Sequence, residues 1–248
     1  MISAFFHTFF YNPIYNLLVA LVALVPGGDV GIAVVVLTII IRLILLPFSL
    51  SAARTQRAMR ALEPKLAELK EKHKDNKEEH ALKTLELYRT ERVNPFASIL
   101  TVFVQLPVLL GLYWVFYYEP FTVLNTALLY SFTPVPGTIT DSLFGLVPLA
   151  EKSVVLAFLA GLTQYLQAQF ALSNAPKPTG TGMQADFSRV MAIQLRYVFP
   201  ILIATVAYST SAAIALYFVT TNTVGVLQEW YVRRQVSGVR DQVSGVSN

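Results

Sequence analysis

The chain has no cysteine and little charge. Without cysteine it cannot form a disulfide framework, a thiolate metal site or a thiol nucleophile. It also lacks a Gly-rich phosphate loop, an HExxH motif and a GxSxG motif, so we expect no enzymatic activity, no cofactor and no metal. Lys, Arg, Asp and Glu make up 14% of the 248 residues, whereas a soluble globular domain has about 25%. With 54% hydrophobic residues, the chain is predicted to be a membrane protein.

Basic residues are missing from long stretches and concentrated in others. Arg42 is the only Lys or Arg before residue 51, residues 51–93 hold 11, and residues 94–151 hold none. Loops rich in Lys and Arg remain in the cytoplasm. The distribution therefore places residues 51–93 inside and residues 119–151 outside. Lys152 is the one basic residue at an outer edge.

Five apolar stretches are long enough to cross a membrane as helices, at about 1.5 Å per residue and about 20 residues per crossing. With the charge distribution, five crossings put the N-terminus outside and the C-terminus in the cytoplasm. We therefore predict an all-α protein of the bacterial cell membrane. The predicted segments are an external N-terminal segment with an interfacial helix (1–28), the first span (29–50), a cytoplasmic helical hairpin (51–93), the second span (94–118), an external loop (119–151), the third span (152–172), a cytoplasmic loop (173–189), the fourth span (190–208), an external turn (209–211), the fifth span (212–230) and a cytoplasmic tail (231–248).

The N-terminal segment is predicted to contain a separate helix over residues 13–25. Asn12 is its expected N-cap and Pro13 its first helical residue. Thr8, Asn12 and Asn16 recur at four-residue spacing, which is typical of the polar face of an interfacial helix. The alternative is a sixth span with the N-terminus inside, but 13 residues make only about 20 Å of helix. The N-terminus lacks the basic region and cleavage site of a signal peptide, so we expect it to be retained.

Residues 51–93 carry 11 basic and 8 acidic side chains, too many for a membrane span. Apolar residues recur there at steps of three or four on both sides of a break at 75–76, which predicts an antiparallel helical hairpin with an apolar seam. Pro64 is expected to kink or restart the first helix. A charged connector is the alternative, but it does not account for the apolar repeats. The predicted seam consists of Met59, Leu62, Leu66, Leu69, Leu82 and Leu85.

Arg42 is a candidate functional residue because a charge in hydrocarbon is costly. It lies about 12 Å of helix from the inner end of its span, so snorkelling to the surface is an alternative explanation. Polar residues of the other spans fall in the inner half of the membrane, or in the case of Gln105 near its middle, which favours a wet cavity open to the cytoplasm over a dry network of buried glutamines. These polar residues are Gln105, Gln164, Gln167, Gln169, Gln194, Arg196, Thr220, Thr221, Asn222 and Thr223.

Seven segments together carry a resemblance to a known family. They are YNPIYNLL, GIAVVVLTIIIRLILLPFSL, LEPKLAELKEKHKDN, LYRTERVNPF, QLPVLLGLYW, AGLTQYLQAQ and ALYFVTTNTVGVLQEW. Over residues 11–234 the sequence resembles the bacterial YidC membrane insertases and their mitochondrial Oxa and chloroplast Albino relatives. It lacks the early span and the large insertion domain of many relatives, so it resembles a minimal form.

The resemblance implies a five-helix core with a cytoplasmic hairpin, enclosing a hydrophilic groove that is open to cytoplasm and lipid. It also implies that Arg42 attracts acidic parts of incoming chains and that Thr163 and Gln164 are the family's polar pair. Phe218 stands where the family usually has Trp, so an indole donor is missing. The candidate groove residues are Arg42, Thr38, Gln105, Thr163, Gln164, Gln167, Phe218 and Asn222.

We therefore expect an insertase and chaperone in which the hairpin receives a nascent segment and the groove carries its polar flank across the inner leaflet. The expected partners are nascent membrane proteins and membrane lipids, with a Sec translocon and the ribosome as further candidates. A small channel or transporter and a chaperone that assembles spans without inserting them are the alternatives. The tail at 231–248 is expected to be disordered, and its three arginines make a poor clamp for ribosomal RNA.

Overall fold

The computed structural model describes the backbone of residues 2–74, 76–91, 93–94, 97–119, 121, 123–172 and 189–244. Within these ranges, the side chains of residues 2–3, 53, 56–57, 77, 97–105 and 232–244 are not described. The predicted cytoplasmic loop at 173–189 therefore lies almost wholly outside the described residues, and so does the side chain of Gln105.

The described chain is mostly helical, as the sequence predicts for an all-α membrane protein. Three helical stretches are long and apolar enough to cross a membrane, namely Ala4–Leu24, Val154–Leu172 and Arg189–Ser209. A fourth candidate is the bent pair Val30–Ile44 and Leu46–Ala52. Residues 97–118 form one further helix, α7 (Ala97–Tyr118), of which Leu106–Tyr118 is apolar.

The first predicted span is not one straight helix. It is divided at Leu45 into α3 (Val30–Ile44) and α4 (Leu46–Ala61), whose axes differ by 55°. Pro47 lies in the first turn of α4, where its missing N–H and its ring interrupt the hydrogen-bonding pattern of the preceding turn. The bend follows the last turn of α3, which contains Arg42.

The N-terminal helix begins earlier than predicted. Residues 2–24 are helical throughout, as α1 (Ile2–Phe6), the π-helical turn η1 (His7–Tyr11) and α2 (Asn12–Leu24). The prediction that Asn12 is an N-cap was wrong, because its N–H bonds back to the carbonyl of His7 across the π-turn. A wide turn before Pro13 relieves the clash of the proline ring with the preceding carbonyls, so the helix continues through the proline. The same arrangement recurs at η4 (Gln194–Val198) and α10 (Phe199–Ser209), where Pro200 follows the π-turn.

Residues 119–151 form a loop that folds back over the N-terminal helix. The loop contains η3 (Thr126–Leu128) and the two-stranded β1 (Ser142–Leu143) and β2 (Val147–Pro148), and a short 3₁₀ turn, η2 (Pro26–Gly28), faces it. Asn16 is 4% exposed rather than solvent-facing. Its side chain donates to the carbonyl of Leu128 at 2.9 Å and accepts from the N–H of Tyr130 and the hydroxyl of Thr133, both at 2.7 Å.

The loop is also attached to the start of α3. Asp29 caps this helix by accepting from the N–H of Ile32 at 2.9 Å, and its second carboxylate oxygen accepts from the N–H of Phe144 at 2.6 Å. Gly28 has a φ of 63°, and a Cβ there would lie 1.9 Å from the carbonyl oxygen of Thr138. Only glycine therefore fits this close approach of the two segments.

The charged segment after α4 forms two helices, α5 (Glu63–Lys72) and α6 (Lys77–Thr90), with the first restarting near Pro64 as predicted. They pack against each other, and an ion pair joins Lys65 to Glu91. Leu62 is buried, and Met59, Leu66 and Leu69 are partly buried. The second half of the predicted seam was wrong, because Leu82 is 66% and Leu85 48% exposed. The face of α6 that is less exposed carries His80, Thr84, Leu87 and Tyr88.

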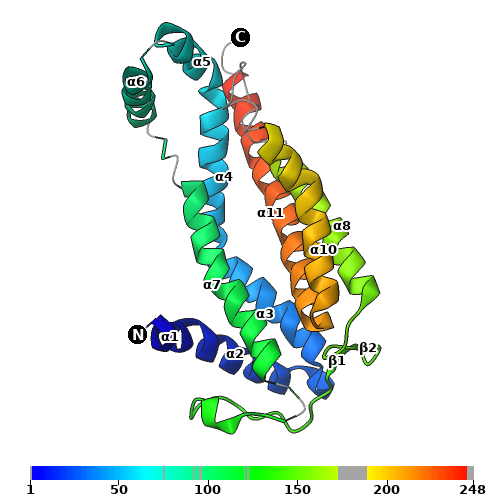
Figure 1. Cartoon of the computed structure of the whole chain (residues 1–248). Coiled ribbons are helices and arrows are strands. Elements are labelled where there is room, and N and C mark those ends of the chain that lie inside the picture. Colours follow the sequence, from blue (N-terminus) through cyan, green and yellow to red (C-terminus); the bar gives the residue numbers. More distant parts are fainter. Residues whose placement is uncertain are drawn as a thin grey trace.

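The bundle has two ends and two groups of helices (Figure 1). We call the end with residues 119–151 the loop end and the end with α5 and α6 the hairpin end. Between them, α4 runs beside α7, while α8 (Val154–Leu172), α10 and α11 (Ala212–Ser244) form a second group. The helix α3 packs against α11 near the loop end, and α1 and α2 run across that end rather than along the bundle. The tail was predicted to be disordered, whereas α11 continues to Ser244.

Candidate functional site

Arg42 lies in the last turn of α3, just before the 55° bend into α4. Its Nε atom is buried and has no hydrogen-bond partner among the described residues. Tyr217 of α11 is close enough to interact with the guanidinium electrostatically. Thr38, one turn earlier on α3, is fully buried and donates to the carbonyl of Val34 at 2.7 Å. Of the two predicted site residues on α3, Thr38 is therefore satisfied within its own helix, whereas the Nε atom of Arg42 has no partner in the described structure.

The buried polar residues Asn222 and Thr221 of α11 differ in their hydrogen bonding. Asn222 is 2% exposed and donates to the carbonyl of Ala160 and to the hydroxyl of Thr163, both at 3.3 Å. The predicted site residues Thr163 and Asn222 therefore join α8 to α11 directly, without water. Thr221 differs, because its hydroxyl oxygen is buried and has no partner within the described part of the chain. An unpaired buried hydroxyl is costly.

The glutamines of α8 are half-buried and do not form one network. Gln167 packs against α11 at Gly225, where an added Cβ would lie 2.5 Å from the glutamine Nε2. Gln169 donates to the hydroxyl of Tyr165 at 2.8 Å, one turn away on its own helix. Gln164 is half-buried on the same helix. Close packing of α8 on α11 thus explains the position of the Gln167 side chain, whereas Gln164 and Gln169 remain partly accessible.

Phe218 occupies a buried site beside Arg42's neighbour Tyr217. It is 7% exposed, and its ring centre lies 5.6 Å from that of Tyr217. A buried indole needs a hydrogen-bond partner for its N–H, whereas a phenyl ring does not. The difference from the family's tryptophan is therefore compatible with the apolar packing at this position.

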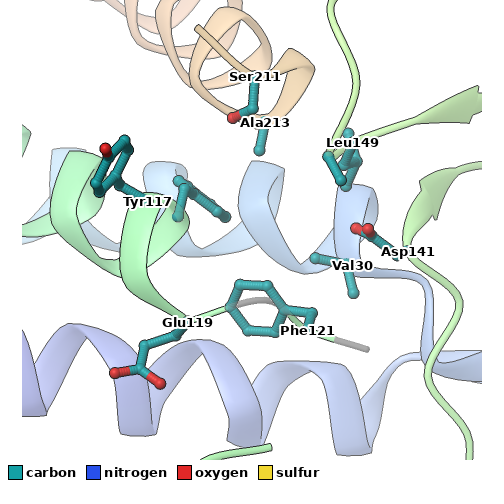
Figure 2. Close-up of a pocket in the computed structure, with 10 residues that line it drawn as sticks. Val30, Tyr117, Glu119, Phe121, Asp141, Leu149, Ser211 and Ala213 are labelled. Atoms are coloured by element: carbon teal, nitrogen blue, oxygen red, sulfur yellow. The ribbon is translucent and has the colours of Figure 1, made fainter. Parts of the chain in front are cut away.

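A further polar site lies at the loop end, and sequence reasoning did not predict it. Two adjoining pockets of about 180 and 290 Å³ share Phe116, Tyr117, Ala150 and Ser211. We call them together the loop-end pocket. Figure 2 shows Ser211, directly before α11, and Ala213 of α11 facing Val30 and Phe121 across the smaller pocket. The lining residues are far apart in the sequence, and 209–211 was interpreted only as a turn.

Charged groups at the rim of the pocket have their own partners or lie near solvent. Glu119 points away from the pocket (Figure 2) and accepts from the hydroxyl of Tyr11 at 2.7 Å. Burial raises the pKa of the Asp141 carboxyl, while a hydrogen bond from the N–H of Ala150 acts in the opposite direction. Lys152 is exposed, with its Nζ 5.9 Å from the ring centre of Tyr208.

Comparison with known proteins gives a consistent result. The family described as 60Kd inner membrane protein matches residues 21–239. A protein of Fusobacterium nucleatum named membrane protein insertase YidC is 31% identical over 230 residues, which are 90% of this chain and 98% of that protein. Proteins of the same name from Ectopseudomonas mendocina and Azotobacter vinelandii are 32% and 33% identical over 228 residues.

The relatives differ in length. The chain spans nearly all of the Fusobacterium protein but only 34% and 36% of the Ectopseudomonas and Azotobacter proteins. The apolar helices and the inner-membrane family together place the chain in the bacterial plasma membrane. The matched range contains α3 and α4, before and after the bend that follows Arg42, and all the residues that line the loop-end pocket. The chain therefore belongs to the 60Kd inner membrane protein family, the family of YidC membrane protein insertases.

Proposed function

We propose that this chain inserts membrane proteins through a polar groove beside Arg42, between α4 and α7 on one side and α8, α10 and α11 on the other. The observation that carries the proposal is the buried Nε of Arg42, which lacks a partner among the described residues. A guanidinium binds a carboxylate through charge-assisted hydrogen bonds, which are about twice as strong as neutral ones. An acidic flank of a client chain would supply the missing acceptor.

The bend at Leu45 supports the position of this groove. It carries α4 alongside α7, whereas α3 stays packed on α11. Arg42 lies in the last turn of α3, so its side chain starts immediately before this bend. The unpaired hydroxyl of Thr221 lies one turn beyond Tyr217 on α11 and provides a second polar group for a client or for water.

The insertion itself needs no nucleotide. A client span of about 20 apolar residues gains roughly 25 cal/mol for each Å² of apolar surface that it buries in lipid. This gain offsets the cost of moving a short polar tail, provided that the groove lowers the barrier. A membrane potential adds about 2.3 kcal/mol per charge per 100 mV for acidic tails that move outward.

We further propose five spans with the N-terminus outside and the hairpin of α5 and α6 in the cytoplasm. The 11 basic residues at 51–93, against none at 94–151, support this orientation. The helices α1 and α2 run across the loop end, which supports an interfacial position despite a length that suffices for a span. Nascent membrane proteins and lipids are the proposed partners, with a Sec translocon and the ribosome as candidates at the hairpin end.

The test compares two clients that differ only in the charge of the translocated tail. We expect Arg42→Ala to slow insertion of the acidic-tail client by about tenfold or more, since a hydrogen bond to a charged group is worth about 1.5 kcal/mol or more. Insertion is measured by protease protection, with the purified protein as the only insertase in liposomes. Arg54→Ala, which removes an exposed arginine of α4, is the matched control.

One further variant and the neutral-tail client make this test more specific. Arg42→Lys keeps the charge and is expected to retain much of the activity, unless the client carboxylate needs the two-pronged guanidinium. The neutral-tail client is expected to insert at nearly the parent's rate with every variant. Equal insertion of both clients by Arg42→Ala and by the parent would remove Arg42 from the mechanism. Failure of the parent protein to insert either client would reject the insertase function.

A further inference from the structure

One face of α11 connects Arg42 with the loop-end pocket. Ile214, Tyr217 and Thr221 recur at steps of three or four and so share a face of the helix, and Ser211, directly before its first residue, continues the same spacing. Ser211 and Ile214 line the larger part of the pocket, and Tyr217 interacts with Arg42. Tyr217 is the sixth residue after Ser211, which corresponds to about 9 Å along a helix. The pocket therefore lies close to Arg42 in the direction of the loop end.

The region between them is apolar and closely packed. Ile214 is 5% exposed and belongs to the same buried cluster as residues of α3 and α7. We call this layer the septum, and it consists of Ile214 together with Val34, Leu37, Leu112 and Val115. No side chain of the septum offers a hydrogen bond, so a polar segment crossing it loses its hydration. The positions at its two sides, Ser211 directly before α11 and Tyr217 within it, are about 9 Å apart along the helix, much less than the roughly 30 Å of a hydrocarbon core.

Beyond the septum the pocket is polar. Besides Ser211, its larger part is lined by Ser209, Thr210, Lys152 and the tyrosines at 113 and 117. The hydroxyl oxygen of Ser211 is buried and has no partner among the described residues. A volume of about 290 Å³ holds several water molecules, since each occupies about 30 Å³ in the liquid. A hydrated chain segment could replace that water and satisfy Ser211.

We propose that the loop-end pocket is an exit vestibule, which receives the polar tail of a client after the tail has crossed the septum, and that Ile214 is the plug between vestibule and groove. This inference rests on the proposed insertase function and on its orientation. The position of the pocket indicates that a client tail occupies it. A tail held at Arg42 reaches the next polar site by the shortest route if it moves along this face of α11 to the pocket. Lys152, the one basic residue of the outer side, stands at the mouth of the vestibule.

The first experiment places a photoreactive side chain at Ser211 and stops a client halfway through insertion. We expect crosslinks from Ser211 to the translocating polar tail. The control position is Ile201, which is 69% exposed on α10 and does not line the pocket. Crosslinks from Ser211 to lipid alone, to the client's apolar span alone, or to the tail no more often than from Ile201 would overturn the vestibule.

The second experiment tests the plug with changes in opposite directions. Ile214→Ser lowers the apolar barrier and is expected to speed translocation of a long polar tail severalfold, whereas Ile214→Trp thickens it and is expected to slow translocation. Ile201→Trp is the matched control and should have no effect. Unchanged rates for both Ile214 variants would overturn the plug. The parent protein is assayed with the same client in the same liposomes. Failure of the parent to insert that client would reject the insertase function, whereas unchanged rates for the Ile214 variants beside an active parent would reject only the plug.

Discussion

Asn16 shows how a single amide can determine the shape of one end of the molecule. Its side chain makes four hydrogen bonds, to the carbonyls of Asn12 and Leu128, the N–H of Tyr130 and the hydroxyl of Thr133. All but one of these partners belong to the loop at 119–151. The amide uses both its donors and both its acceptor sites, and this saturation is what makes a buried asparagine tolerable.

We predict that Asn16→Leu detaches this loop. The substitution leaves a carbonyl and an N–H of the loop buried without partners, at about 1 to 3 kcal/mol for each group. The measurement is the melting temperature in detergent, together with the rate at which a protease cuts residues 119–151.

Asn12→Leu is the matched control for this prediction. Asn12 lies one turn earlier on the same helix, and its side-chain oxygen is buried without a partner in the described structure. Its replacement is therefore expected to leave the melting temperature nearly unchanged or to raise it. Equal losses for both asparagines would show that helix packing, and not the amide of Asn16, holds the loop.

At the scale of elements, the hairpin has one apolar side and one exposed side. Leu62 at the end of α4 is 5% exposed, whereas Leu82 on α6 is 66% exposed. We predict that Leu62→Asp lowers the melting temperature and impairs insertion. Burying that leucine contributes about 1.5 to 3 kcal/mol, and an aspartate there would be a buried unpaired charge.

Leu82→Asp is expected to leave the melting temperature unchanged, because the side chain already lies in solvent. Both variants are compared by thermal unfolding and by rescue of cells that lack other insertases. If both variants are tolerated, the hairpin acts only as a tether. A loss of insertion with Leu82→Asp at an unchanged melting temperature would instead indicate that the exposed leucines of α6 contact a partner.

These elements also show what the sequence could predict. The starts of α8 and α11 lie within two residues of the predicted spans, because hydropathy and turn residues are local signals. Periodicity placed Leu82 and Leu85 on one face of α6, but it could not say which face meets α5. The bend at Leu45 and the helical continuation before Pro13 depend on packing and on wide turns, for which the sequence offers only a proline as a signal.

The candidate site was predictable to a similar degree. A lone arginine in an apolar run pointed to Arg42, and the structure gives that residue a buried Nε without a partner among the described residues. Sequence alone could not distinguish the satisfied Thr163 and Asn222 from the unsatisfied Thr221, since all three are polar residues at similar depth. It also missed Ser211, because a pocket that joins residues 116, 150 and 211 exists only after folding.

At the scale of the whole molecule, polar groups occupy both ends and an apolar core separates them. The buried cluster joins α2, α3, α7, α8 and α11 near the loop end. Toward the hairpin end, α4 and α7 part from the other group (Figure 1), and Arg42 lies in the last turn of α3, before the bend that leads into α4. The buried apolar cluster thus lies toward the loop end, whereas α4 and α7 are separate from the other group toward the hairpin end, as the proposed entry of polar segments from the hairpin end requires.

Orientation across the membrane gives the last prediction. Because the chain has no cysteine, single cysteines can be introduced without removing others. Ser131 and Asn76 are both exposed, in the loop at 119–151 and at the start of α6 respectively. The 11 basic residues at 51–93 oppose translocation of the segment around Asn76, whereas residues 94–151 carry none. We expect Ser131→Cys to react with a membrane-impermeant thiol reagent in intact cells.

Asn76→Cys is expected to react only after the membrane is opened, and reaction of both cysteines in lysed cells is the control. A third cysteine at His7, which is exposed on η1, decides the position of the N-terminal helix. Reaction of His7→Cys from outside supports an interfacial helix, since α1 and α2 then stay on the side of Ser131. Reaction only after opening would make Ala4–Leu24 a sixth span, as its length permits. Labelling of Ser131→Cys and Asn76→Cys from the same side would contradict the five-span arrangement, and with it the groove that opens toward the cytoplasm.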